Sequence, residues 1–270
     1  MPSARFASLS PIASASVEPP AAAGRCSGCR QPGDDFAFTM AFQPIVDMAR
    51  GEVFAHEALV RGPAGESAAS ILARVTDSNR YWFDQQCRIR AIELADRLGM
   101  REVLSINFMP NAVYRAEACI RATLEAAERT GFPTERIMFE VSESEQVVDR
   151  GHLKSIFREY RRCGFLTAID DFGAGYAGLD LLADFQPDVA KIDMALLRGI
   201  DRDPARRIIV GHTVRMLDEL GVRVIAEGVE TRDEQRVLAD LGVHLMQGYL
   251  FARPAFEALA CLPEAAFASR

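Results

Sequence analysis

The stretch TAIDDFGAGYAGL, residues 167–179, decides between two folds, because it leads from an apolar run through two aspartates into a glycine-rich loop. The loop contains the G-x-G-x-x-G pattern of dinucleotide-binding folds, at Gly173, Gly175 and Gly178. Asp170 and Asp171 stand directly before the first glycine, where two carboxylates would repel a bound pyrophosphate. The stretch therefore disfavours a dinucleotide site and indicates a strand end whose carboxylates hold metal.

Eight short apolar runs alternate with segments of helical length along most of the chain. They are MAFQPIVD (40–47), VFAHEALVR (53–61), VLSINF (103–108), RIMFEVSE (136–143), LTAIDDF (166–172), VAKIDM (189–194), RVIAEGV (223–229) and LMQGYLF (245–251). Helices are predicted between them at 111–130, with Asn111 as the cap, and at 145–162, 203–220 and 231–241. The alternation favours a parallel (β/α)₈ barrel, although a doubly wound sheet fits the same pattern.

Polar side chains lie late in, or just after, these apolar runs: Glu57, Asn107, Glu140, Asp170, Asp171, Lys191, Asp193, Glu227 and Gln247. In a barrel the carboxyl ends of the strands converge on one mouth, so these residues would meet there. The acidic groups then need compensating charge, because unpaired buried charges are costly. We expect two divalent cations about 4 Å apart, Mg²⁺ or Mn²⁺, because the donors are carboxylate and amide oxygens without histidine or thiol.

Several of these polar residues also fit a structural role. Asn107 and Gln247 could hydrogen-bond buried backbone groups, and Asp193 could serve only as an ion-pair partner of Lys191. Glu230 could stabilise the start of the helix that follows it. Lys191 stands out nevertheless, because the chain has only two lysines.

Composition narrows the class of protein. The formal net charge of -7 disfavours a surface that coats nucleic acid, and no apolar run reaches the length of about 20 residues that a membrane span needs. Six scattered cysteines suit a reducing, cytoplasmic location. Residues 1–35 are rich in Ala, Ser and Pro and are expected to form a disordered tail, in which Cys26 and Cys29 make at most half of a zinc site. The functional domain is expected at 36–270.

Eight motifs occur in one order along the chain: FQPIVD, HEALVRG, SINF, FEVSE, DDFGAGY, KIDM, VIAEGVET and QGYLFARP. Through these motifs the chain, from about Phe38 to Pro263, resembles the EAL domain family of cyclic di-GMP phosphodiesterases. The resemblance implies a modified TIM barrel with one antiparallel strand, which replaces the parallel expectation for the first strand. It also implies two Mg²⁺ or Mn²⁺ ions, hydrolysis of cyclic di-GMP to linear pGpG, and a homodimer.

The resemblance assigns a role to each matching residue. One metal would be bound by Glu57, Asn107, Glu140 and Asp170, and the other by Asp170, Asp171 and Glu227. The catalytic residues would be Lys191, Glu227 and Glu57, with Lys191 positioning or polarising the attacking water, supported by Asp193 and Gln247. Substrate contacts would come from Arg61, Gln43 and Gln247. Behind the ligands would stand Glu230 and Glu143, of which Glu143 resembles the glutamate that secures the loop after Asp171.

The glycine-rich loop departs from the family pattern, because Ala177 and Gly178 stand where two serines are usual. Two hydroxyls are lost and backbone freedom is added in a loop that must hold metal ligands still. Two functions therefore stay open: a phosphodiesterase, or a non-hydrolysing cyclic di-GMP receptor or regulator that binds a partner protein. A glycosidase is disfavoured, since it needs two carboxylates and has no use for so many oxygen donors.

Overall fold

The computed structural model describes residues 36–113, 115–143, 150–175, 178–262 and 264–267. The expected tail at 1–35, with Cys26 and Cys29, and the loop residue Ala177 lie outside these ranges. Within the described ranges, no helix is both long and apolar enough to cross a membrane.

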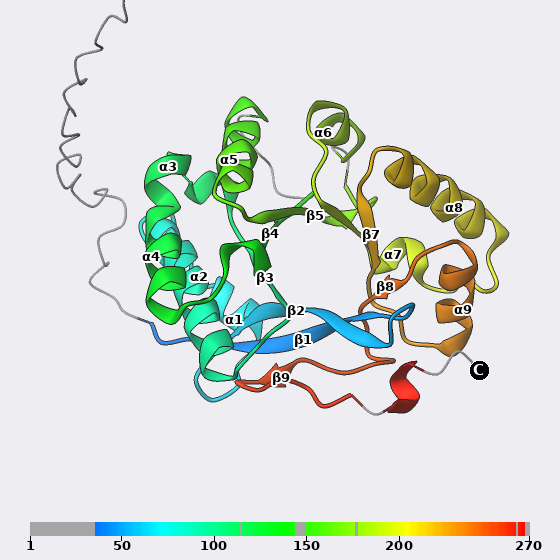
Figure 1. Cartoon of the computed structure of the whole chain (residues 1–270), viewed down its shortest axis with the longest axis horizontal. Coiled ribbons are helices and arrows are strands. Elements are labelled where there is room, and N and C mark those ends of the chain that lie inside the picture. The colour runs from blue at the N-terminus through cyan, green and yellow to red at the C-terminus, as the bar shows by residue number, and fades with distance from the viewer. Residues whose placement is uncertain (1–35, 114, 144–149, 176–177, 263, 268–270) are drawn as a thin grey trace, which may run out of the picture.

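All eight predicted strands form, and they close into one barrel (Figure 1). They are β1 Thr39–Asp47, β2 Glu52–Arg61, β3 Val103–Asn107, β4 Ile137–Ser142, β5 Leu166–Phe172, β6 Val189–Ile192, β7 Arg223–Ala226 and β8 Leu245–Met246. Pairing runs in order from β2 to β8 and then to β1, which completes the ring by pairing with β2. The barrel excludes a doubly wound sheet, because such a sheet keeps two open edges.

The first strand is antiparallel to both of its barrel neighbours, β2 and β8, whereas the pairs from β2 to β8 are parallel. The direction follows from the short turn after β1, since strands joined by so few residues can only pair antiparallel. Gly51 ends this turn at φ 68°, and its N–H donates to the Asp47 carbonyl at 2.8 Å. A ninth strand, β9 Ala255–Phe256, pairs with β1 outside the ring. The single antiparallel barrel strand implied by the family resemblance is confirmed.

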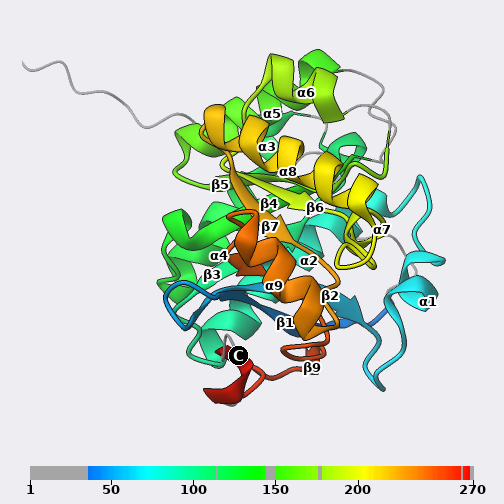
Figure 2. The same ribbon diagram turned by 90° about the vertical axis from the view of Figure 1, so that its right-hand side faces the viewer.

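Helices lie around the outside of the barrel (Figures 1 and 2). They are α1 Ala68–Leu72, α2 Arg80–Arg97, α3 Ala116–Cys119, α4 Arg121–Thr130, α5 Arg150–Arg162, α6 Gly178–Asp184, α7 Met194–Leu197, α8 Pro204–Glu219 and α9 Arg232–Asp240, with 3₁₀ turns η2 Pro110–Ala112, η3 Thr134–Arg136 and η4 Glu264–Phe267. Two predicted helix starts are confirmed. Asp203 caps α8 by accepting backbone N–H groups, and Thr231 forms a capping box with Glu234 at the start of α9.

Two helix predictions need correction. Asn111 does not cap a helix, because it lies inside η2, and the segment to Thr130 is divided into α3 and α4. The long helix α2 was not among the predicted helices. Its buried face includes the polar residues Asp84, Gln85 and Arg88, which weaken the apolar repeat that marks a helix in sequence.

The interior of the barrel begins with a complete apolar layer. Each strand supplies one residue to it: Ile45, Ala55, Val103, Met138, Ala168, Val189, Ile225 and Leu245. Because side chains alternate across a strand, the residues on either side of these point outward and pack against the helices. Leu104 and Phe139, for example, share an outer cluster with Ile92 of α2 and Phe157 of α5. The apolar layer forms the floor beneath the barrel mouth.

Candidate metal centre at the barrel mouth

A polar layer lies directly above this apolar floor. On each strand it is formed by the inward-facing residue two positions nearer the mouth, which alternation keeps on the inner face. Its members are Gln43, Glu57, Ser105, Glu140, Asp170, Lys191, Glu227 and Gln247. Gln43 precedes Ile45 in sequence, because β1 runs opposite to the other strands. The fold therefore brings together residues that are up to about two hundred positions apart.

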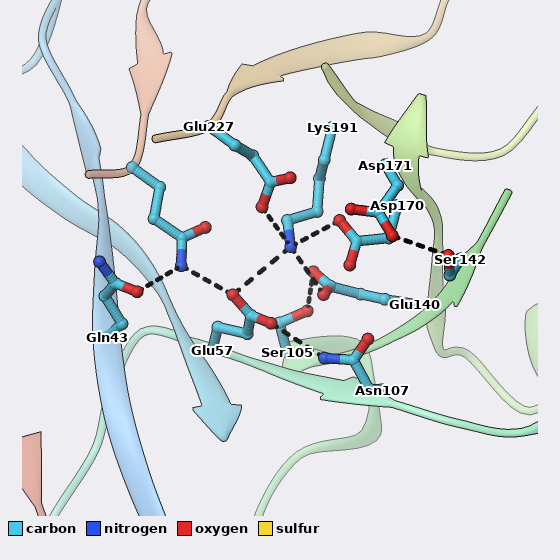
Figure 3. Close-up of polar contacts among 11 residues, drawn as sticks. Gln43, Glu57, Ser105, Asn107, Glu140, Ser142, Asp170, Asp171, Lys191 and Glu227 are labelled. Atoms are coloured by element: carbon cyan, nitrogen blue, oxygen red, sulfur yellow. Dashed lines mark hydrogen bonds and ion pairs between the residues drawn. The ribbon is translucent and has the colours of Figure 1, made fainter. Parts of the chain in front are cut away.

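Lys191 lies at the centre of the polar layer (Figure 3). Its side chain is fully buried, and its Nζ lies 2.8 Å from Glu227, 2.9 Å from Glu140, 3.0 Å from Asp170 and 3.5 Å from Glu57. One ammonium group thus faces four carboxylates. The position of Lys191 on β6 explains this, since Asp170 lies on the neighbouring strand β5 and Glu227 directly follows the neighbouring strand β7.

The crowding of carboxylates shifts the protonation of several groups. Burial raises the pKa of Glu140 to about 8, with the charges of Glu57 and Asp170 adding to the shift and Lys191 opposing it. Burial also raises the pKa of Glu227 well above its ordinary value, against the attraction of Lys191. Burial by itself would lower the pKa of Lys191, but the four carboxylates outweigh it and raise that pKa. The layer holds more negative charge than one ammonium balances.

Glu57 is held in place from two sides. Asn107 Nδ2 donates to its Oε1 at 2.9 Å, and Gln247 Nε2 donates to its Oε2 at 2.7 Å. Gln247 also lies 3.4 Å from Gln43 Oε1, and Gln43 Nε2 donates to the Ala252 carbonyl at 3.2 Å. This chain of amide groups links Glu57 to the rim of the barrel. The side-chain amides of Asn107 and Gln247 thus bind a carboxylate, whereas the structural alternative expected them to hydrogen-bond buried backbone groups.

Asp170 and Asp171 both face the centre, although adjacent strand residues normally point to opposite faces. The β5–β6 pairing shifts register between Ile169 and Phe172, as a bulge does, and Asp171 has a left-handed backbone with φ 56°. Asp tolerates this conformation better than most residues. Ser142 Oγ donates to Asp171 Oδ2 at 2.7 Å and fixes the carboxylate. The bulge therefore turns two carboxylates toward the centre, where regular strand geometry would turn one.

Glu143 contacts the loop that follows these aspartates. Its carboxylate accepts the Gly173 N–H at 2.7 Å, and its own N–H donates to the Asp170 carbonyl at 2.9 Å. Gly173 has φ 92°, and a Cβ there would come within 2.3 Å of Leu196. The position thus requires glycine, and Glu143 holds that glycine against the end of β4.

The donor set suits hard divalent cations. Carboxylate oxygens lie within 4.8 Å of one another in two groups: Glu57, Glu140 and Asp170 in one, and Asp170, Asp171 and Glu227 in the other. Asp170 belongs to both groups. Oxygen donors are those that Mg²⁺, Mn²⁺ and Ca²⁺ prefer, and the pKa values of Glu140 and Glu227 are raised by burial and by neighbouring carboxylates, in spite of Lys191. The residues present therefore fit two divalent cations.

Two serines that the sequence analysis did not single out also belong to the centre. Ser105 donates to Glu140 Oε1, and Ser142 donates to Asp171. Each lies two residues from a predicted ligand on the same strand, Ser105 before Asn107 and Ser142 after Glu140. Strand periodicity could therefore have found both, because residues two apart share a face.

For three further predicted site residues, the structure gives each of them other partners. Asp193 caps α7 by accepting a backbone N–H at 2.8 Å, and it is not among the carboxylates within 4.0 Å of Lys191 in the described structure. Glu230 forms an ion pair with Arg198 at 2.9 Å. Arg61 ends β2 at the mouth and donates to a backbone carbonyl at 2.7 Å. Their predicted roles stay predictions.

Curated relatives share the domain but are longer proteins. The blue light- and temperature-regulated antirepressor BluF of Escherichia coli is 30% identical over 214 residues, which are 79% of this chain and 53% of BluF. The cyclic di-GMP phosphodiesterase NbdA of Pseudomonas aeruginosa is 29% identical over 236 residues, 83% of this chain and 30% of NbdA. The chain thus spans about half the length, or less, of these relatives.

Solved structures resemble the chain more completely. A standalone versatile EAL protein from Vibrio cholerae O395, in its c-di-GMP-bound form, matches with a TM-score of 0.84 and 52% identity over 87% of this chain and 99% of its own. BlrP1 of Klebsiella pneumoniae, in a manganese/cy-diGMP complex, matches with a TM-score of 0.78 and 36% identity over 84% of this chain and 58% of its own. The model of the family described as "EAL domain" matches residues 34–254 of the chain. The barrel with one reversed strand and this match over most of the sequence show that the chain belongs to the EAL domain family.

Proposed function

We propose that the chain is a metal-dependent phosphodiesterase that hydrolyses one phosphodiester bond of cyclic di-GMP to give linear pGpG. The observation that carries the proposal is the pair of oxygen-donor groups that share Asp170 at the barrel mouth. The solved relatives with bound c-di-GMP, one of them with manganese, support this substrate and this kind of ion. The relative NbdA, named as a cyclic di-GMP phosphodiesterase, supports the reaction.

The residues of the centre would divide the work. Glu57, Asn107, Glu140 and Asp170 would hold one ion, and Asp170, Asp171 and Glu227 would hold the other. Bound there, Mg²⁺ or Mn²⁺ would supply Lewis acidity toward water and the phosphodiester group. Lys191, held 2.8 Å from Glu227 and 3.0 Å from Asp170, would donate a hydrogen bond to the attacking water and orient it.

The substrate would be held at the rim by Arg61 and Gln43. The Arg61 guanidinium stands at the mouth end of β2 and offers a planar set of donors that suits a phosphate group. Gln43 is joined through Gln247 to Glu57. A substrate that contacts Gln43 would therefore be coupled to a metal ligand, which favours one orientation of the scissile bond.

Turnover of purified protein tests the proposal. The chain with Mn²⁺ or Mg²⁺ should convert cyclic di-GMP to pGpG, and a chelator should stop the reaction. Glu57→Gln should abolish it, whereas Glu52→Gln, a matched change at the exposed start of the same strand, should leave it unchanged. Folded protein that binds the ions and the nucleotide but forms no pGpG would contradict the proposal.

We also propose that the chain forms a homodimer through α6 and α8. Leu179 on α6 and Ile208 and Ile209 on α8 are exposed by 65%, 62% and 51%, and the two helices share one apolar cluster beneath. Covering these side chains would remove apolar surface from water. In sedimentation velocity, Ile208→Asp should lower the dimer fraction. A wild-type chain that sediments as a monomer at a protein concentration of tens of micromolar would argue against the homodimer.

A second candidate function is a receptor that binds cyclic di-GMP, or a partner protein, without cleavage. It is favoured by the loss of two hydroxyls at Ala177 and Gly178 and by the relative that is named an antirepressor. Calorimetry that shows saturable nucleotide binding with no pGpG in the presence of Mn²⁺ would select this function. If the Ala177→Ser/Gly178→Ser variant gained turnover, that result would instead favour the phosphodiesterase function.

A further inference from the structure

A buried charged network lies behind the barrel wall, outside the metal centre. Arg88 on α2 is completely buried, and its Nη2 lies 2.6 Å from Asp84 Oδ2 one helical turn away. Its Nη1 donates to the hydroxyl of Tyr160 on α5 at 2.6 Å. Asp84 and Tyr160 are buried as well. The network therefore ties two helices together in a place where an apolar contact would be the ordinary solution.

Stability alone does not account for this network. Taking two charges out of water costs about as much as their mutual attraction returns, so a buried ion pair is often replaced by apolar residues without loss. Unpairing is costly in contrast, because it leaves one buried charge alone. The reason for an ion pair here must lie in what the charged groups hold in position.

The guanidinium of Arg88 packs against the strand ends that carry metal ligands. Its central carbon lies 5.5 Å from the ring of Phe108 and 5.1 Å from the ring of Phe139. Phe108 directly follows Asn107, and Phe139 directly precedes Glu140. Because neighbouring strand residues face opposite sides, the rings point outward to Arg88 while the ligands point into the mouth.

Asp84 holds the backbone of the turn that follows Asn107. Its Oδ1 accepts the Met109 N–H at 2.9 Å, while its Oδ2 faces Arg88. Met109 immediately precedes η2, where the chain leaves the barrel wall. On the other side of the same strand end, Asn107 donates to Glu57 at 2.9 Å. A shift of this turn would move the Asn107 amide away from Glu57.

We propose that Asp84, itself fixed by Arg88 and Tyr160, is a positioning residue that sets Asn107 for metal binding through the Met109 N–H. The inference rests on the proposed function, because Asn107 matters in this way only if the mouth binds divalent cations. Groups behind metal ligands typically change metal affinity by about 10- to 100-fold when they are removed. Asp84 acts less directly than such groups do, because it binds the backbone N–H of Met109 and not the Asn107 side chain.

Two double variants separate this role from a merely structural one. Asp84→Asn/Arg88→Met removes both charges but keeps an oxygen that can accept the Met109 N–H. Asp84→Leu/Arg88→Met removes the charges and the acceptor together. Both replace a buried ion pair by groups of similar size, which the fold should tolerate. We expect Mn²⁺ affinity, measured by calorimetry, to fall about 10-fold or more in the leucine-containing variant and to be largely kept in the asparagine-containing one.

Leu238→Ala is the matched control, because it empties part of the separate core under α9 and lowers stability without touching the network. Its Mn²⁺ affinity should equal that of the wild type at a temperature where every variant is folded by circular dichroism. Equal affinities in the two double variants, or a wild-type affinity in the leucine-containing one, would overturn the proposal.

Hydrogen exchange gives a readout that needs neither substitution nor metal. In the metal-free wild type the Met109 amide should exchange slowly, because its acceptor is buried. Fast exchange at Met109 would overturn the proposal even if the variants fail to fold. A wild type without Mn²⁺ uptake or turnover would refute the proposed function instead, and the exchange of Met109 would still decide whether Asp84 holds the turn.

Discussion

Ser105 carries a single hydroxyl that contacts Glu140, one of the proposed metal ligands. It is fully buried on β3 and donates to Glu140, while Lys191 takes the other carboxylate oxygen of Glu140. The two contacts fix the plane of that carboxylate. A ligand whose plane is fixed loses less freedom when an ion binds, so the hydroxyl contributes to affinity without touching the ion.

Ser105→Ala should therefore weaken Mn²⁺ binding by about 10-fold and lower turnover at limiting metal, because Glu140 gains rotational freedom. Saturating Mn²⁺ should restore most of the turnover. Titration calorimetry on metal-free protein measures the effect. Ser155→Ala on the exposed side of α5 is the control and should change neither quantity, since its hydroxyl only meets a backbone carbonyl. Unchanged affinity in Ser105→Ala would rule out this role for the hydroxyl.

The protonation of Glu140 makes metal uptake depend on pH. Its pKa in the metal-free protein is raised to about 8, so below that pH a cation must displace a proton from the carboxyl. Mn²⁺ affinity should rise between pH 6 and pH 8, with release of protons on the acidic side. Calorimetry in two buffers of different ionisation enthalpy counts those protons. Affinity that is constant across this range, without proton release, is incompatible with the raised pKa.

At the scale of an element, the bulge in β5 decides how many carboxylates this strand presents at the barrel mouth. Regular alternation predicts the inward placement of Glu57, Glu140 and Lys191 from sequence, and these placements are confirmed. It cannot predict that Asp171 joins Asp170, because the left-handed backbone at Asp171 depends on the pairing of β5 with β6. Long-range pairing of this kind leaves no local signal.

The outer elements show the same limit. Helix caps such as Asp203 and Thr231 could be predicted from the sequence, since a cap binds backbone groups only a few residues away. The helix α2 escaped prediction because Asp84 and Arg88 face its buried side, where the partner that permits them, Tyr160, is 72 residues from Arg88. Local patterns thus identified the strands and the inward-facing polar residues. The helix α2 and the position of Asp171 depend on partners far away in the sequence, which local patterns do not show.

The loop after β5 should depend on the carboxylate of Glu143. Glu143→Gln keeps an oxygen that can accept the Gly173 N–H, whereas Glu143→Ala leaves that N–H without its charged acceptor. We expect the glutamine variant to keep more turnover than the alanine variant, and the alanine variant to need more Mn²⁺ for half-maximal rate. Steady-state kinetics against Mn²⁺ concentration measures both. Equal behaviour of the two variants would show that the loop is held by other contacts.

At the scale of the whole molecule, the apolar layer is the floor beneath the candidate metal centre. Ile225 lies two residues below Glu227, and its strand pairs with the strand of Lys191. Ile225→Ala should cost about 2–5 kcal/mol of unfolding free energy and also weaken Mn²⁺ binding, because the floor can shift. Leu238→Ala, which empties the outer core, should cost a similar amount without changing metal affinity. Denaturant melts and metal titrations of the two variants test this difference, and equal metal affinities would contradict it.

The pairing of β1 with β8 and β9 has a consequence for synthesis on the ribosome. The strand β1 finds its last barrel partner, β8, only after residue 246 has been translated, and Glu57 finds Gln247 one residue later. Until that moment a nascent copy has an incomplete ring. A message cut short before this codon would thus yield a product that lacks both the closing pair of the ring and the Gln247–Glu57 contact.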